Sequence, residues 1–369
     1  MICLDEIRGR LAEVFSLKTY RIDHVLYGAI ASAAVYGALT GASAEMIESA
    51  IGMVVSHYTP WRSIRAGKQL SDSKGSSAAL STEAAILSIK RAMKGFLGPR
   101  DIFRNPDSPF RWNVKTGGDS PFDLILSHSG DDFAVSHMHF KLGLYEHQSA
   151  GAIEGILRLL MKNPEIYTSP AAREDIKEIV VKAYEPAFSI IGDPAKRDPH
   201  TRQSADHSMV YIVSTLLRKA IERREPLPND LNEVWSHLML TPYDYSHQSI
   251  FNELTRKLME KTSFEHGGEE YDEKYPEGVP TSVTIEMANG RIYDSGFIMF
   301  PTGHASNAEA NLEKILNEKF RLMADIAISD KEEAEEFLKK LKNMESLTNE
   351  DLQTLYYIKS LQFHEPIDQ

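Results

Sequence analysis

The chain has 369 residues, of which 42% are hydrophobic and 25% charged, as in ordinary globular proteins, which excludes a largely disordered chain or a collagen-like fibre. Its 53 acidic and 41 basic side chains give a net charge of −12, so the long-range field does not attract nucleic acid or an anionic membrane. A single cysteine, Cys3, excludes an intrachain disulfide and a Cys/His zinc site. No apolar run is long enough to span a bilayer. An anionic ligand would therefore need a local basic pocket in a net-acidic protein.

The first third of the chain predicts closely packed helices. Helical periodicity predicts three of them, over residues 23–39, 44–56 and 74–94. Asp23 can cap the first helix, and Gly95 and Gly98-Pro99 end the third. The many small residues on these helices favour close packing over an exposed amphipathic surface. Residues 105–130 are rich in Pro, Gly, Asp and Ser and predict a loop.

The pattern changes after residue 132. The partly alternating run 133–145 and the run IKEIVVKAY (176–184) predict strands, whereas 147–162 and 204–222 predict helices. Asn289-Gly290 between two β-rich runs predicts a hairpin. Charged helices are expected from 307 to 360. The predicted layout is helical, then α+β, then helical, and the last helices can return to pack on the first.

Basic residues gather before the third predicted helix. Arg62, Arg65, Lys68 and Lys74 lie close together in sequence, and a Gly/Ser-rich step (74–77) opens the helix. Small residues allow a ligand to approach the backbone, and free N–H groups at a helix start bind anions. This segment is the best candidate for an anion pocket. The alternative is a basic loop solvated at the surface.

Two other segments carry possible acid–base groups. His24 lies at a helix start, where the helix dipole favours the neutral, basic imidazole; the alternative is an exposed His beside a capping Asp. His207 and Tyr211 are four residues apart, which predicts one shared helix face, with Ser204 or Asp206 as the cap. Such a pair can exchange protons or bind a carboxylate, and the alternative is a capped helix with a core tyrosine.

Two histidines, His137 and His139, are two apart in the predicted strand 133–145 and would share one face. Two imidazoles can bind a metal, but no carboxylate or cysteine completes the set. No metal site is therefore expected.

Four stretches in this order resemble the MmgE/PrpD family, which comprises 2-methylcitrate dehydratases with cis-aconitate decarboxylases as relatives. They are RIDHVLYGAIASAAVYGALTG, IRAGKQLSDSKGSSAALSTEAAIL, RQSADHSMVYIVSTLL and EKYPEGVPTSVTIEMANGRIYDSGFIMFPTGH. The stretches extend from about residue 20 to 305. SDSKG and GPRDIFRNP resemble the 2-methylcitrate dehydratase branch.

The resemblance implies a large all-α helical domain with an inserted α+β lid domain and an active site between the two. The expected boundaries are 1–132 for the first helical part, 133–306 for the lid and 307–369 for the C-terminal helices that return to the helical domain. It also implies no cofactor and no metal, a homodimer, and a cytoplasmic protein, or one of the mitochondrial matrix in a eukaryote. Family members usually begin with a further helical block, which this chain is expected to lack.

The implied reaction is loss of water from 2-methylcitrate to give 2-methyl-cis-aconitate in propionate catabolism, the methylcitrate cycle. The residues that match the catalytic positions are His24, Lys74, Lys141 and Tyr211. We expect the tricarboxylate to be held by Arg65, Lys68, Arg202 and His207. The alternatives are a decarboxylase or isomerase of cis-aconitate-like acids, and an inactive truncated paralogue with a structural role.

Overall fold

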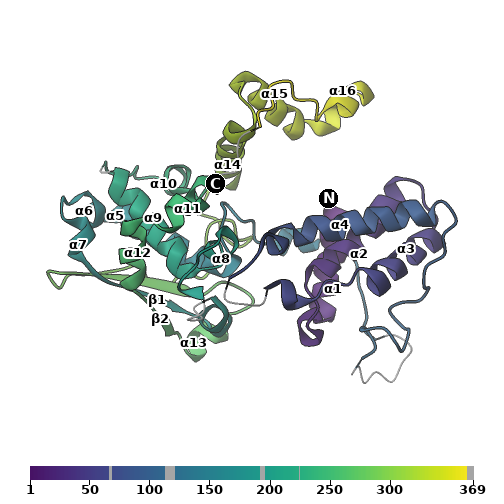
Figure 1. Ribbon diagram of the computed structural model, residues 1–369, viewed down its shortest axis with the longest axis horizontal. Coiled ribbons are helices and arrows are strands. Elements are labelled where there is room, and N and C mark those ends of the chain that lie inside the picture. Colours follow the sequence, from purple (N-terminus) through teal and green to yellow (C-terminus); the bar gives the residue numbers. More distant parts are fainter. Residues whose placement is uncertain (66–68, 113–120, 192–195, 224, 364–369) are drawn as a thin grey trace. The chain divides into compact units, whose positions relative to one another are not determined.

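The computed structural model describes residues 1–65, 69–112, 121–191, 196–223 and 225–363 (Figure 1). The chain divides into two compact units, Met1–Met138 and His139–Gln369. The first unit is helical, and the second combines helices with a four-stranded mixed sheet. Among the described residues, no helix is both long enough and apolar enough to cross a membrane.

Four longer helices carry the described part of the first unit: α1 (Ile2–Val14), α2 (Val25–Leu39), α3 (Ala44–His57) and α4 (Asp72–Ala92). The 3₁₀ turns η2 (Arg62–Arg65) and η3 (Ala134–His137) follow α3 and end the unit. The three predicted helices are confirmed to within two residues at each end. Gly95, which follows α4, has a φ of +87°, as expected for a residue that ends a helix. α1 was not among the predicted helices.

Short side chains line the faces along which α2, α3 and α4 pack together. The buried residues of this core include Ala29, Ile30, Ala33, Ala50, Val54, Ala85 and Ile89. Because alanine adds little bulk to a helix, the helix axes can approach closely, and the small-residue pattern gave the right expectation for this region.

The second unit packs helices against one sheet. The strands are β1 (Ile176–Ala183), β2 (Thr262–His266), β3 (Thr281–Met287) and β4 (Ile292–Asp294), in the order β2-β1-β3-β4. β1 pairs with β2 in parallel, and the other pairs are antiparallel. α5 (Ala150–Lys162) contacts both β3 and α9 (Met209–Arg223), and the core of the unit lies between them.

The remaining helices of the second unit are short or lie toward the C-terminus. They are α6 (Glu165–Thr168), α7 (Ala172–Asp175), α8 (Arg202–Ala205), α10 (Leu231–Leu238), α11 (His247–Ile250), α12 (Glu253–Glu260), α13 (Glu269–Asp272), α14 (Leu312–Ala327), α15 (Lys331–Lys342) and α16 (Asn349–Thr354). Helix α14 packs on α10, and its Ile315 is part of the core of this unit. The C-terminal helices are thus present as expected, while their return to the first helical domain stays a prediction.

The structure confirms the predicted strand at 176–184 and the predicted hairpin, in which Gly290 has a φ of +83° between β3 and β4. The predicted strand at 133–145 is wrong. Its N–H groups bond to unrelated partners instead of one neighbouring strand: Phe140 donates to the Gly303 carbonyl and Leu142 to the Tyr145 hydroxyl. His139 forms only an isolated bridge with His304. His137 and His139 therefore do not share a strand face.

Candidate functional site

In the first unit, the start of α2 is fastened to the segment that follows α3. Ile22 and Trp61 form an antiparallel bridge, and the Asp23 N–H donates to the Pro60 carbonyl at 2.8 Å. On the other side of the bridge, the Arg62 N–H donates to the backbone of residue 21, also at 2.8 Å. These backbone bonds fix where the side chains of 62–65 lie relative to the start of α2.

The carboxylate of Asp23 is fully buried and is bound by a guanidinium group. Arg65 donates through Nε to one carboxylate oxygen and through Nη2 to the other, the second bond measuring 3.2 Å. The Val25 N–H also donates to Asp23, at 3.2 Å, so Asp23 supports the helix start as predicted. Burial acts to raise the pKa of Asp23, but these hydrogen bonds outweigh it and hold the pKa below its usual range. Asp23 is therefore a buried anion.

His24 follows directly and occupies the N-cap position of α2. Its side chain is 64% exposed, and its Nδ1 lies 3.5 Å from Asp23 Oδ1. The pKa of His24 is lowered, because nearby protein atoms remove water from the ring and because guanidinium groups oppose its protonation. Those groups belong to Arg65, Arg62 and Arg8, whereas Asp23 acts in the opposite direction. The result is a neutral imidazole open to solvent, as the helix position predicts.

Helices α2 and α4 run in the same direction. At their C-terminal ends, Thr40 Oγ1 lies 3.6 Å from Met93 Sδ, and at their beginnings Arg65, shortly before α4, binds Asp23. Both N-terminal ends, which are the positive ends of the helix dipoles, therefore lie at one end of this unit. Lys74 is in the first turn of α4 and only 9% exposed, so it belongs to the same end as His24.

Two predicted anion-binding residues of this unit have different outcomes. Arg65, expected to hold substrate, directs Nε and Nη2 at Asp23, and its contact with substrate stays a prediction. Lys68 lies outside the described residues. The predicted Gly/Ser-rich step at 74–77 does not open the helix, because α4 begins at Asp72 and the step lies within its first turns.

In the second unit, Tyr211 is fully buried on α9. Its hydroxyl donates to the backbone carbonyl of Asp244, and burial raises the pKa of Tyr211 to about 12. The Asp244 carboxylate is held in turn by Lys219 at 2.7 Å. Tyr211 therefore lies in an ordered polar network inside the core.

His207 does not share a helix face with Tyr211, and that expectation is wrong. α8 ends at Ala205 and α9 begins at Met209, so His207 lies in the turn between them. The predicted cap of α9 is also wrong, because the hydroxyl that accepts the Tyr211 N–H, at 3.3 Å, belongs to Ser208. His207 contacts the carboxylate of the preceding Asp206 through Nδ1.

Arg202 is an exposed residue at the first position of the short helix α8, which Thr201 caps by accepting the Ser204 N–H. Lys141 is exposed as well, and its ammonium lies 5.8 Å from the centre of the Tyr145 ring. Both cations stand within the second unit, so the structure describes them separately from His24 and Lys74.

The rings of three histidines lie close together in the second unit, and two of these residues, His139 and His147, are near Lys141 in sequence. The ring of His139 lies 4.7 Å from that of His147 and 5.6 Å from that of His304, centre to centre. Burial and its two imidazole neighbours lower the pKa of His139 to about 3, so this ring stays neutral. Among the described residues, no group of three or more His, Cys, Asp or Glu side chains has an arrangement that would hold a metal. Sequence spacing gave no sign of this cluster, because His304 is remote in the chain.

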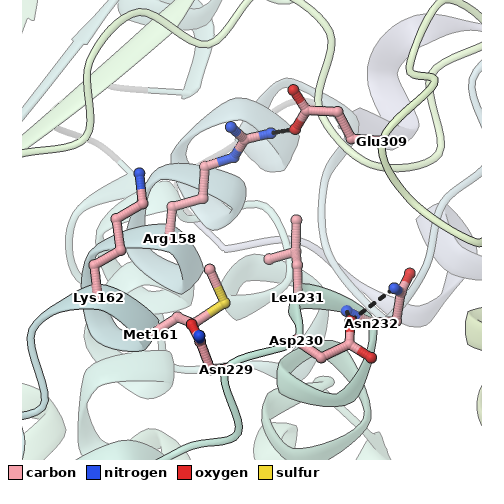
Figure 2. Close-up of a pocket in the computed structure, with 8 residues that line it drawn as sticks. All are labelled: Arg158, Met161, Lys162, Asn229, Asp230, Leu231, Asn232 and Glu309. Carbon is pink, nitrogen blue, oxygen red and sulfur yellow. Dashed lines mark hydrogen bonds and ion pairs between the residues drawn. The ribbon is translucent and has the colours of Figure 1, made fainter.

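A cavity of about 420 Å³ lies elsewhere in the second unit, between α5, the start of α10 and the loop before α14 (Figure 2). Arg158 crosses its wall and binds Glu309 at 2.6 Å and the buried Glu154 at 3.0 Å. Asp230 is bound by Lys314 at 3.3 Å. The acidic side chains of this cavity, Glu309 and Asp230, are thus paired with cations of the protein itself. None of the site residues predicted from the sequence lines the cavity.

Family profiles match both parts of the chain. The profile of the MmgE/PrpD N-terminal domain matches residues 1–118, and that of the MmgE/PrpD C-terminal domain matches residues 145–222.

Curated relatives agree with the profiles. The alkylcitrate dehydratase phiI of Fungal sp. (strain ATCC 74256) is 23% identical over 89% of this chain and 60% of its own length. The 2-methylcitrate dehydratase of Escherichia coli (strain K12) is 23% identical over 87% of this chain and 62% of its own. The mitochondrial 2-methylcitrate dehydratase of Yarrowia lipolytica is 24% identical over 87% and 57%. The chain thus spans about 60% of the length of these relatives.

Proposed function

Because the chain belongs to the MmgE/PrpD family, we propose that it is a hydro-lyase of the 2-methylcitrate dehydratase type. The proposed substrate is a small tricarboxylate, with 2-methylcitrate and its product 2-methyl-cis-aconitate as the specific pair. Support comes from the dehydratase names of the relatives and from the chemistry of the two helix starts in the first unit.

The reaction sets three chemical demands. A base must remove a proton from the carbon beside a carboxylate, an acid must protonate the hydroxyl that leaves as water, and cations must offset the carboxylate charge as it spreads. The C–H and C–O bonds break and a C=C bond forms, so no electrons are exchanged with a cofactor. Side chains alone can supply these functions.

The observation that carries the proposal is the exposed, neutral imidazole of His24 at the end of the first unit where the starts of α2 and α4 lie together. A neutral imidazole can accept a proton at neutral pH, which the protonated form cannot. Lys74, at the same end, supplies positive charge for a substrate carboxylate, and the two helix dipoles add to it.

The second unit supplies the other proposed groups. Lys141 and Arg202 are exposed cations, assigned here to substrate carboxylates. Lys74 is assigned to protonate the departing hydroxyl. Tyr211, whose hydroxyl is bound to the Asp244 carbonyl, is the second assignment, and a Tyr211→Phe variant separates the two. His207 is assigned to the binding of the tricarboxylate.

The direct test mixes the purified chain with 2-methylcitrate and follows the conjugated alkene by its ultraviolet absorbance. We expect His24→Asn to lower kcat by about 100-fold or more, the usual contribution of a general base. Lys74→Ala should lower kcat/KM strongly as well. Lys162→Ala is the matched control, because Lys162 is exposed on the wall of the cavity in the second unit, which no predicted site residue lines.

The proposal fails if the chain forms no alkene and its melting temperature does not rise with any tricarboxylate, since a bound ligand must stabilise the folded state. It also fails if His24→Asn and Lys162→Ala behave alike. Release of carbon dioxide in place of water would move the assignment to a decarboxylase.

A further inference from the structure

The ion pair between Asp23 and Arg65 contains more hydrogen bonds than a helix cap requires. A cap needs one oxygen and one N–H, and Val25 already satisfies that requirement. Arg65 instead engages both oxygens of Asp23, which fixes the plane of the carboxylate. The side chain of Arg65 is only 19% exposed and that of Asp23 is fully buried, so solvent does not compete strongly for the pair.

The backbone around this pair is equally constrained. Asp23 is tied to Pro60 by its own N–H, and the Ile22–Trp61 bridge lies beside it. The segments around Asp23 and around Pro60 are therefore held together by their backbones. This fixes the carboxylate of Asp23, and its Oδ1 lies 3.5 Å from Nδ1 of His24.

A fixed carboxylate beside Nδ1 favours the imidazole tautomer that carries its proton there. A proton on Nδ1 is attracted to the carboxylate, whereas a lone pair on Nδ1 is repelled by it. The other ring nitrogen, Nε2, is then left with its lone pair available to accept a proton. Free imidazole side chains prefer the opposite tautomer, so the carboxylate reverses an intrinsic preference.

We propose that Asp23 and Arg65 are positioning residues, which hold His24 in its Nδ1–H tautomer and present Nε2 as the base. The catalytic part of this inference rests on the proposed dehydratase function, whereas the tautomer does not. Arg65 accordingly acts on the substrate through Asp23 and His24, in place of binding a substrate carboxylate directly.

The charges around His24 determine in which direction each substitution should shift its pKa. Asp23 favours protonation of the ring, and Arg65, Arg62 and Arg8 oppose it. Removing the negative charge in Asp23→Asn should lower the pKa of His24 further, since the guanidinium groups then act unopposed. Removing a positive charge in Arg65→Gln should raise it. The two variants of one ion pair are expected to shift the same ring in opposite directions.

The test labels the full-length protein with ¹⁵N-histidine and measures the ring nitrogen shifts of His24 by NMR against pH, with His24→Gln to assign the signal. The wild type should show the Nδ1–H tautomer, and Asp23→Asn should move the ring toward Nε2–H. His266 is an internal control, because its ring pairs through Nε2 with Asp272 at 2.9 Å in the second unit and should not change.

A double variant guards against misfolding. Asp23→Asn leaves Arg65 buried without its anion, whereas Asp23→Asn with Arg65→Gln keeps a neutral hydrogen-bonded pair. Both should lose the Nδ1–H tautomer. If either folded variant retains it, with an unchanged His24 titration, the inference is overturned.

Kinetics supply the second measurement. Asp23→Asn should lower kcat by about 10- to 100-fold, typical for loss of a group that orients a ligand or base, and change KM by less than about threefold. A rise in KM with kcat unchanged would overturn the positioning role. If the wild type does not dehydrate 2-methylcitrate, the proposed function fails, and the NMR result alone decides whether Asp23 sets the tautomer.

Discussion

Two glycines inside helices of the first unit differ sharply in the space around them, and replacing each by alanine tests how closely the chain packs. At Gly52, in the middle of α3, an added Cβ would lie 1.7 Å from the carbonyl oxygen of Pro99. At Gly28, in α2, the nearest atom to such a Cβ is Arg8 Cδ at 4.0 Å. The methyl group of Gly52→Ala would therefore push the backbone of Pro99 away from α3, whereas that of Gly28→Ala has room.

The expected energies have opposite signs. Alanine stabilises a helix interior by about 0.5–1 kcal/mol relative to glycine, so Gly28→Ala should raise the free energy of unfolding by roughly that amount. Gly52→Ala gains the same propensity, but a clash with backbone costs about 3 kcal/mol, the upper part of the range for overpacked sites. Its net effect should be a loss of about 2 kcal/mol.

Urea unfolding followed by circular dichroism measures both variants against the wild type under one buffer. The midpoint should rise for Gly28→Ala and fall for Gly52→Ala at similar slopes. A Gly52→Ala protein at least as stable as the wild type would refute the close approach of Pro99 to α3. A loss at Gly28 as large as that at Gly52 would show that α2 does not have the space described.

Three further outcomes are expected in the second unit. Tyr211→Phe should lower stability by about 1–2 kcal/mol, measured by thermal unfolding, because it leaves a buried carbonyl oxygen without its donor. Burial raises the pKa of Glu146 from 4.5 to about 7, so the folded state favours the protonated acid. The free energy of unfolding therefore falls as pH rises through that interval. Glu146→Gln should remove this loss, so the variant should melt at a higher temperature than the wild type at pH 8 but not at pH 4. Arg158→Ala should cost about 3 kcal/mol, since it leaves the buried Glu154 without its cation, while the exposed Lys162→Ala on the same cavity wall should change stability by less than about 0.5 kcal/mol in the same melts.

Sequence reasoning succeeded where the signals are local. Helical periodicity and terminal glycines lie within one segment, so the bounds of α2, α3 and α4 were nearly right. The hairpin succeeded for the same reason, because Asn289-Gly290 sets its own turn. The segment 133–145 failed because alternation reports which side chains can face a core and does not report whether a partner strand exists.

The candidate site shows the same limit. His24 was found from its place at a helix start, which is a local feature, whereas the ion pair that holds it joins residues 42 positions apart. A basic residue in a loop gives no sign of whether its partner is a ligand or a distant carboxylate. The prediction that His207 and Tyr211 share one helix face was wrong because of a small shift in a helix boundary. Helix α9 begins at Met209, so His207 lies outside it.

The net charge of −12 and an anionic substrate are compatible because the charges nearest His24 differ from the average of the chain. At physiological ionic strength, exposed charges more than about 8–10 Å apart are largely screened, so the groups closest to the ring determine the potential there. The guanidinium groups of Arg65, Arg62 and Arg8 act on the ring of His24. Asp23 forms an ion pair with Arg65, and Asp5 forms one with Arg8. These groups carry more positive than negative charge, which adds to the desolvation that mainly lowers the pKa of His24 and would attract a carboxylate. Neutralising Arg65 alone should remove this excess of positive charge.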